Sequence, residues 1–72
     1  MSVDHTIQVR INGEHRRVAE GISIAELVSE LGFDTVRVAV ERNLEVVPRS
    51  TLSDVSVQDG DDFEIVRFVG GG

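Results

Sequence analysis

Apolar and polar residues alternate in the first part of the chain, as they do in a β-strand with one buried face. Ile7, Val9 and Ile11 are the apolar positions of this alternation. Asn12-Gly13 follows directly and favours a tight hairpin, because both residues tolerate the positive φ that a type I′ turn requires. We therefore expect residues 14–19 to return as an antiparallel strand whose first residue lies opposite Ile11.

The spacing of apolar residues then changes to that of a helix. They recur at i, i+3, i+4 and i+7 and form one stripe, made of Ile24, Leu27, Val28 and Leu31. Ser23 and Glu26 have the spacing of a capping box, in which each side chain accepts a hydrogen bond from the backbone of the other. With Gly32 as the left-handed residue at its end, the pattern predicts a helix that covers one face of a sheet.

Two further strands are predicted after the helix. The third strand is indicated by alternating valines, Val36, Val38 and Val40. It ends near Glu41, and Asn43 is suited to a left-handed position in the turn that follows. Residues 45–47 indicate a short fourth strand at an edge of the sheet, because Pro48 cannot donate to a strand ladder.

The last predicted strand leads into a run of glycines. Residues 49–58 favour an irregular connection with one short helical turn. Residues 63–69 are apolar at nearly every position, which is typical of a central strand with both faces partly covered. Gly70, Gly71 and Gly72 have no β-carbon to pack, so we expect a flexible thread that ends in the Gly72 α-carboxylate.

The order of these elements predicts an α+β protein. Two strands, a helix, two strands, a connection and a final strand are most simply arranged as a β-grasp, or ubiquitin-like, fold. This fold is a mixed sheet of about five strands with one main helix packed across it. We expect residues 1–69 to form this domain and residues 70–72 to form the tail.

Composition removes several classes of function. The formal net charge of -6 argues against nucleic acid, whose phosphates require clustered basic residues. The chain has no cysteine, so a thiol nucleophile and a thiolate metal site are both excluded. No apolar run approaches the roughly 20 residues of a membrane span, and the first residues do not resemble a signal peptide. We therefore expect a cytoplasmic protein that contacts no membrane.

Few side chains are candidates for chemistry. His5 and His15 have no second ligand or base at a useful spacing, so both are interpreted as solvated strand residues. The acidic run at residues 59–62 is interpreted as a turn, because it offers too few oxygen donors for a calcium loop. We expect no metal site. The remaining candidate is the Gly72 carboxylate, whose alternative interpretation is an uninformative frayed terminus.

Several short motifs give the sequence a specific resemblance. They are Ile11-Asn12-Gly13-Glu14, Ile24-Ala25-Glu26-Leu27-Val28, Val38-Ala39-Val40-Glu41-Arg42-Asn43, Val47-Pro48-Arg49-Ser50, Asp59-Gly60-Asp61 and Val69-Gly70-Gly71-Gly72. In this order they resemble the ThiS family, the sulfur carrier proteins of thiamine biosynthesis, over nearly the whole chain. A terminal Gly-Gly alone is a weak signal, and its combination with the internal motifs carries the resemblance.

The resemblance implies a carrier that is not itself an enzyme. A ThiF-type adenylating enzyme uses MgATP to convert the Gly72 carboxylate into an acyl-adenylate, while the carrier binds no cofactor of its own. A persulfide sulfur, drawn from cysteine by a desulfurase, then gives a thiocarboxylate that a ThiG-type thiazole synthase consumes. Gly70 and Gly71 give access to both active sites. Docking is expected at three residues near the tail, Val47, Arg67 and Phe68.

Two other functions stay open. The small subunit of molybdopterin synthase is a sulfur carrier of the same fold, but it usually approaches its Gly-Gly through a proline that residues 65–69 lack. A ubiquitin-like modifier, or a plain interaction module, is the third hypothesis. A modifier joins its terminal carboxylate to a target lysine, and the glycine tail alone does not separate this from sulfur transfer.

Overall fold

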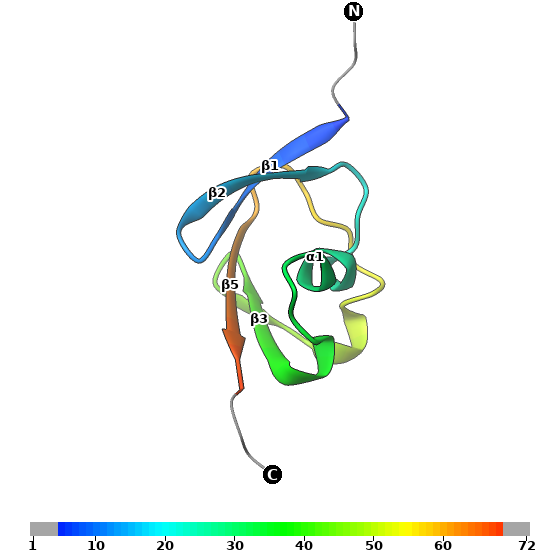
Figure 1. The fold of residues 1–72 in the computed structure, drawn as a ribbon, viewed down its shortest axis with the longest axis vertical. Helices are drawn as coiled ribbons and strands as arrows, with labels where there is room; N and C mark the ends of the chain where they lie inside the picture. The colour runs from blue at the N-terminus through cyan, green and yellow to red at the C-terminus, as the bar shows by residue number, and fades with distance from the viewer. Residues whose placement is uncertain (1–4, 69–72) are drawn as a thin grey trace, which may run out of the picture.

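The computed structural model describes residues 5–68, which form one sheet with a helix on one face (Figure 1). The strands and the helix are β1 (Thr6–Ile11), β2 (Glu14–Ala19), α1 (Ile24–Glu30), β3 (Val38–Arg42), β4 (Glu45–Val47) and β5 (Asp62–Arg67). Two short 3-10 turns lie at Thr35–Arg37 and Arg49–Thr51. The strand order β2-β1-β5-β3-β4 is that of the predicted β-grasp fold.

The first hairpin has the predicted register. Ile11 pairs with Glu14, and Asn12 and Gly13 take φ of 50° and 86° in the turn between them. Since side chains alternate along a strand, this register places Val9 and Val18 together on the buried face. The prediction for residues 14–19 is confirmed.

Helix α1 begins and ends as the sequence predicts. The Glu26 amide donates to Ser23 Oγ at 3.0 Å, and the Ser23 amide donates to Glu26 Oε1 at 2.9 Å. At the other end Gly32 has φ of 87°, and the Phe33 amide donates to the Val28 carbonyl at 3.1 Å. This is a Schellman motif, which gives the last helical carbonyls partners and turns the chain back toward the sheet.

The core lies between α1 and the sheet. Its buried apolar residues come from every layer of the fold: Val9, Ile11, Val18, Ile24, Leu27, Val28, Val38, Val40, Leu52, Val57, Phe63 and Ile65. Phe63, at the centre of the sheet, has no exposed surface, and Leu52 and Val57 close the core from the connection before β5. The helical stripe and the connection therefore pack as the sequence predicts.

The predicted boundaries of two strands are wrong. Val36 is not a strand residue, because the Asp34 side chain accepts its amide hydrogen at 3.0 Å and begins a 3-10 turn that leaves it 62% exposed. Strand β3 therefore begins at Val38. For the last strand residues 63–69 were expected, but β5 begins at Asp62 and ends at Arg67, and residue 69 lies outside the described residues.

The central position of β5 is confirmed, but the predicted cover on both of its faces is wrong. β5 pairs in parallel with β1 and antiparallel with β3, while β4 and β2 are the two edge strands. Among residues 5–68 no element covers the face opposite α1, and Val66 is 57% exposed there.

The predicted tail, residues 70–72, lies outside the described residues. Within residues 5–68 no helix is long and apolar enough to cross a membrane.

The turn between β3 and β4 contains a residue with an unfavourable backbone. Asn43 and Leu44 have φ of 51° and 73°, and the Leu44 side chain is 90% exposed. A type I′ turn favours glycine at its second position, where a β-carbon is crowded. Leu44 therefore costs stability without contributing to the core.

We expect Leu27→Ala to lower the free energy of unfolding by about 2–5 kcal/mol, because it leaves a cavity beneath α1 where Leu27 is 1% exposed. Urea unfolding followed by circular dichroism measures the change. Leu44→Ala is the matched control and should change stability by less than about 0.5 kcal/mol. Equal losses in the two variants would contradict this description of the core.

We expect Leu44→Gly to raise the free energy of unfolding by about 0.5–1 kcal/mol, because glycine adopts positive φ without steric cost. The same urea titration measures this gain. A decrease for Leu44→Gly would show that the Leu44 side chain stabilises the turn.

Candidate functional site

The last described residue, Phe68, is held by the 3-10 turn that precedes β3. The Phe68 amide donates to the Arg37 carbonyl at 2.8 Å, which continues the antiparallel pairing of β5 and β3 beyond Arg67. β1 pairs with β5 only at the start of that strand, as Arg10 with Asp62 and Ile11 with Phe63.

The Asn12 side chain continues this parallel pairing by one step. Its Oδ1 accepts the Ile65 amide hydrogen at 2.8 Å, and its Nδ2 donates to the Ile65 carbonyl at 3.2 Å. A side-chain amide thus takes the place that the next strand residue would fill, at the point where the chain turns away into β2. Asn12 therefore has a second role, beyond the turn that the sequence predicts.

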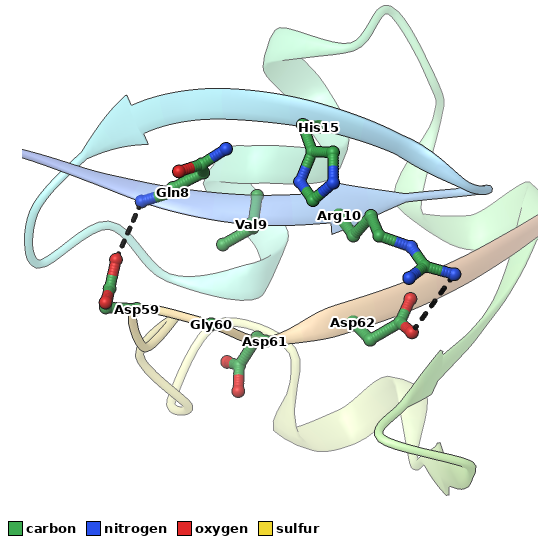
Figure 2. Close-up of a pocket in the computed structure, with 8 residues that line it drawn as sticks. All are labelled: Gln8, Val9, Arg10, His15, Asp59, Gly60, Asp61 and Asp62. Atoms are coloured by element: carbon green, nitrogen blue, oxygen red, sulfur yellow. Dashed lines mark hydrogen bonds and ion pairs between the residues drawn. The ribbon is translucent and has the colours of Figure 1, made fainter.

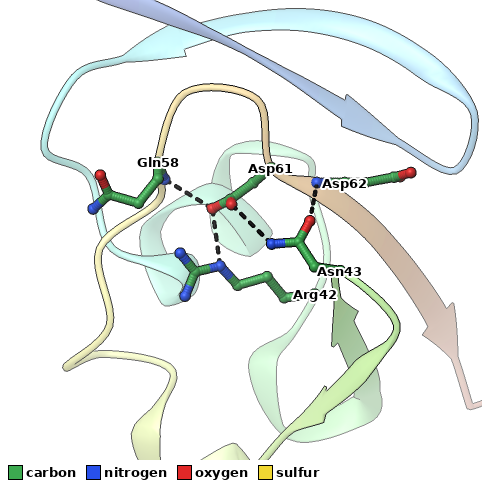
Figure 3. Close-up of polar contacts among 5 residues, drawn as sticks. All are labelled: Arg42, Asn43, Gln58, Asp61 and Asp62. Atoms are coloured by element: carbon green, nitrogen blue, oxygen red, sulfur yellow. Dashed lines mark hydrogen bonds and ion pairs between the residues drawn. The ribbon is translucent and has the colours of Figure 1, made fainter.

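A buried carboxylate fixes the start of β5 (Figure 3). Asp61 is 5% exposed, and its Oδ2 accepts hydrogen bonds from Arg42 Nε at 2.9 Å and from the Gln58 amide at 2.8 Å. Asn43 Nδ2 donates to Asp61 Oδ1 at 3.1 Å, and Asn43 Oδ1 accepts the Asp62 amide hydrogen at 3.0 Å. These contacts join the β3–β4 turn to the first residue of β5.

The same contacts bear on the calcium alternative for residues 59–62. Both Asp61 oxygens accept hydrogen bonds, so this carboxylate points at Arg42 and Asn43 rather than into solvent. In the described part of the chain no group of three or more His, Asp or Glu side chains is placed to hold a metal ion. The acidic run acts as a turn that is tied to its neighbours, and Asp61 was not distinguished from the other acids by the sequence.

His15 lines a shallow pocket of about 320 Å³ between the first hairpin and residues 59–62 (Figure 2). Arg10 lies 3.8 Å from Asp62 there, and the Gln8 amide donates to Asp59 Oδ1 at 2.9 Å. His15 is exposed and pairs across the hairpin with Arg10. The pocket therefore contains no nucleophile paired with a base, and His15 is a solvated strand residue as interpreted.

The three residues predicted for docking do not share one surface. Arg67 lies on the helix side of the sheet, with its guanidinium carbon 5.8 Å from the centre of the Phe33 ring. Val47 is on the same side and half-buried, but it belongs to the edge strand β4, two strands from β5. Phe68 is 53% exposed and points to the opposite face. The predicted residues therefore lie on both faces of the sheet.

The structure instead gathers a different set beside the end of β5, on the face that α1 leaves open. We call this set the open face, and it consists of Ala39, Glu41, Val46, Glu64, Val66 and Phe68. Of the predicted residues only Phe68 belongs to it. Val46 was missed because a three-residue strand with adjacent valines does not show which valine faces the core. The Gly70, Gly71 and Gly72 predictions fall outside the described residues.

Comparison with known proteins shows the family to which the chain belongs. A sequence profile of the ThiS family matches residues 9–72. The crystal structure of a thiamine biosynthesis protein (ThiS) from Geobacter metallireducens superposes with a TM-score of 0.77 and 36% identity, covering 92% of this chain and 100% of that one. The sulfur carrier protein ThiS of Bacillus subtilis is 38% identical over 50 residues, which are 69% of this chain and 76% of that protein.

A longer relative has a different name. The thiazole synthase of Paramagnetospirillum magneticum is 53% identical over 62 residues, which are 86% of this chain. The chain spans 19% of that protein's length and 20% of the length of a second thiazole synthase, from Magnetococcus marinus. The similarity therefore concerns one small part of each longer protein.

We expect Asp61→Asn to lower the free energy of unfolding by about 1.5–3 kcal/mol, because one charged acceptor is replaced by a donor that faces Arg42 and the Gln58 amide. The substitution leaves no cavity, so the loss reports the hydrogen bonds. Urea unfolding measures it. Asp54→Asn, at an exposed position, is the matched control and should change stability by less than about 0.5 kcal/mol. An unchanged Asp61→Asn variant would mean that solvent replaces these contacts.

Proposed function

The chain belongs to the ThiS family, and on that premise we propose that it is a sulfur carrier for thiamine biosynthesis with its sulfur held at Gly72. The observation that carries the proposal is the extent of the family match, which runs through the glycines to residue 72. The Bacillus subtilis relative named as a sulfur carrier supports it.

The chemistry takes place at the α-carboxylate of Gly72. A carboxylate oxygen attacks the α-phosphorus of ATP and pyrophosphate leaves, which gives an acyl-adenylate with AMP as leaving group. A persulfide sulfur then displaces AMP. A second thiol cleaves the sulfur–sulfur bond and is oxidised to a disulfide, which leaves a thiocarboxylate on Gly72. Gly70 and Gly71 allow the thread to enter an active site, because they carry no side chain.

The described residues support a carrier rather than an enzyme. The chain has no cysteine, and both histidines are exposed without a paired base. Its polar network around Asp61 is directed at Arg42, Asn43 and a backbone amide, so it stabilises the fold. What the domain provides is a rigid central strand at the base of the tail, on which a partner enzyme can dock.

The partners follow from this chemistry. We propose a ThiF-type adenylating enzyme that uses ATP and magnesium, a cysteine desulfurase as the source of persulfide, and a ThiG-type thiazole synthase as the acceptor. Two proteins named thiazole synthase that include a segment similar to this chain support the last partner, because a carrier within the same polypeptide is presented at high effective concentration. We place the cycle in the cytoplasm, where ATP is available.

Molybdopterin synthase and ubiquitin-like conjugation are the alternatives. Both use a glycine-terminated β-grasp chain, so the fold does not separate them from a thiamine carrier. The family match to ThiS favours the thiamine pathway over both. The chain contains no lysine, so two copies of it cannot be joined by a lysine isopeptide bond.

We expect the intact mass of the chain to rise by the replacement of one oxygen by one sulfur when it is incubated with MgATP, the adenylating enzyme, cysteine and a desulfurase. Electrospray mass spectrometry measures the change. A variant that lacks Gly72 should show no gain, while Leu44→Ala, at an exposed position in the β3–β4 turn, should react fully. Conjugates to other proteins would instead support a modifier, and no reaction at all would contradict the carrier function.

A further inference from the structure

Two acidic residues face each other on the open face. Glu41 of β3 and Glu64 of β5 are direct partners across the antiparallel ladder. Opposed residues in such a ladder have β-carbons about 4.5–5.5 Å apart, and like charges placed there destabilise a sheet. Both side chains are exposed, so water and salt reduce this repulsion without removing it.

No basic side chain of the described residues neutralises this pair. The arginines near it form ion pairs with other acids. Arg10, on the same face, lies 3.8 Å from Asp62, and Arg42 lies 2.9 Å from Asp61 on the opposite side. Within residues 5–68 neither Glu41 nor Glu64 makes an ion pair. The two charges therefore lie side by side without a local partner.

Apolar residues lie on two sides of the pair, toward β4 and toward the end of β5, while Asp62 and Arg10 lie on the other side. Val46 lies across from Glu41 and is 72% exposed, and Val66 lies across from Ala39 and is 57% exposed. Phe68, the last described residue, extends this apolar surface toward the end of the chain. Exposed apolar groups of this kind form the core of protein interfaces, and a neighbouring ion pair is strengthened when binding excludes water from it.

We propose that the open face docks the enzyme that activates the Gly72 carboxylate, and that an arginine or lysine of that enzyme lies between Glu41 and Glu64. This inference rests on the proposed function. One cation placed between two carboxylates removes their repulsion and gains two charge-assisted contacts, while Val46, Val66 and Phe68 bury apolar area around it.

Charge complementarity favours the activating enzyme as the occupant. The active site of that enzyme must hold a nucleoside triphosphate and a carboxylate, which are both anionic. We therefore expect basic groups around the point where the tail enters. A carrier with a net charge of -6 is steered toward such a surface. The open face adjoins the residue at which the described chain ends, so docking there brings the tail to that entrance.

The test compares Glu41→Gln, Glu64→Gln and the double variant with the wild-type chain. Glu30→Gln is the matched control, because Glu30 is exposed on α1, on the far side of the sheet. Carrier-dependent ATP–pyrophosphate exchange gives KM and kcat for the activating enzyme. We expect the double variant to raise KM for the carrier by about tenfold or more with kcat nearly unchanged, since the lost contacts act in docking. Its KM should also depend less on salt.

A second measurement separates docking from folding. Each single glutamine variant should raise the Tm of the free carrier by about 2–4 °C, because it removes the like-charge repulsion. A gain in stability combined with a loss in recognition is not expected of a residue whose role is only structural. Glu30→Gln should change neither quantity appreciably.

The outcomes distinguish this inference from the function on which it rests. If the wild-type chain supports exchange and the double variant has an unchanged KM, the docking proposal is wrong and the carrier function stands. If exchange is unchanged but sulfur transfer to thiazole synthase is slowed, a different enzyme occupies the face, which also overturns the proposal. No exchange with the wild-type chain would overturn the function and the docking proposal together.

Discussion

The fold depends on the pairing of β5 with a neighbour on each side. β1 lies parallel to it and β3 antiparallel to it, so the last strand of the chain becomes the middle of the sheet. This arrangement buries Phe63 completely and leaves Ile65 only 5% exposed, which anchors α1 against the centre of the sheet. A parallel neighbour requires a long crossover, and the segment from α1 to residue 61 supplies it. The strand that precedes the glycines is consequently also the strand on which the core is built.

Polar contacts add stability that the small apolar core does not supply. A domain of this size buries about 60% of the surface that its unfolded chain exposes, so its apolar packing is limited. Asp61 adds a buried carboxylate with three hydrogen-bond donors, taken from β3, the following turn and Gln58. Because each donor comes from a different part of the chain, the network fixes the position at which β5 enters the sheet.

Local signals predicted the parts of the structure that local chemistry determines. Asn12-Gly13 fixed a register, and Ser23 with Glu26 fixed a helix start, because turn geometry and capping depend on neighbouring residues alone. Val36 was misplaced because a side chain two residues earlier competes for its amide. The opposition of Glu41 and Glu64 follows from a pairing between distant strands, so no pattern within either strand reveals it. Arg67 and Phe68 are neighbours in the predicted strand, so alternation alone places them on opposite faces, whereas the side that Val47 takes depends on the pairing of β4 with β3.

The Asn12 side chain has a consequence for the end of β5. Since alternate residues of a strand direct their backbone groups to opposite neighbours, the Arg67 backbone points to the side where Asn12 has already ended the parallel pairing. Figure 1 shows β5 running on past the hairpin with β3 alone beside it. The end of β5 is therefore hydrogen-bonded along one edge only, the edge that faces β3. On the other edge the Arg67 N–H is a donor and the Arg67 C=O is an acceptor, a few residues before the glycines. An extended segment that bound there would continue the β-ladder.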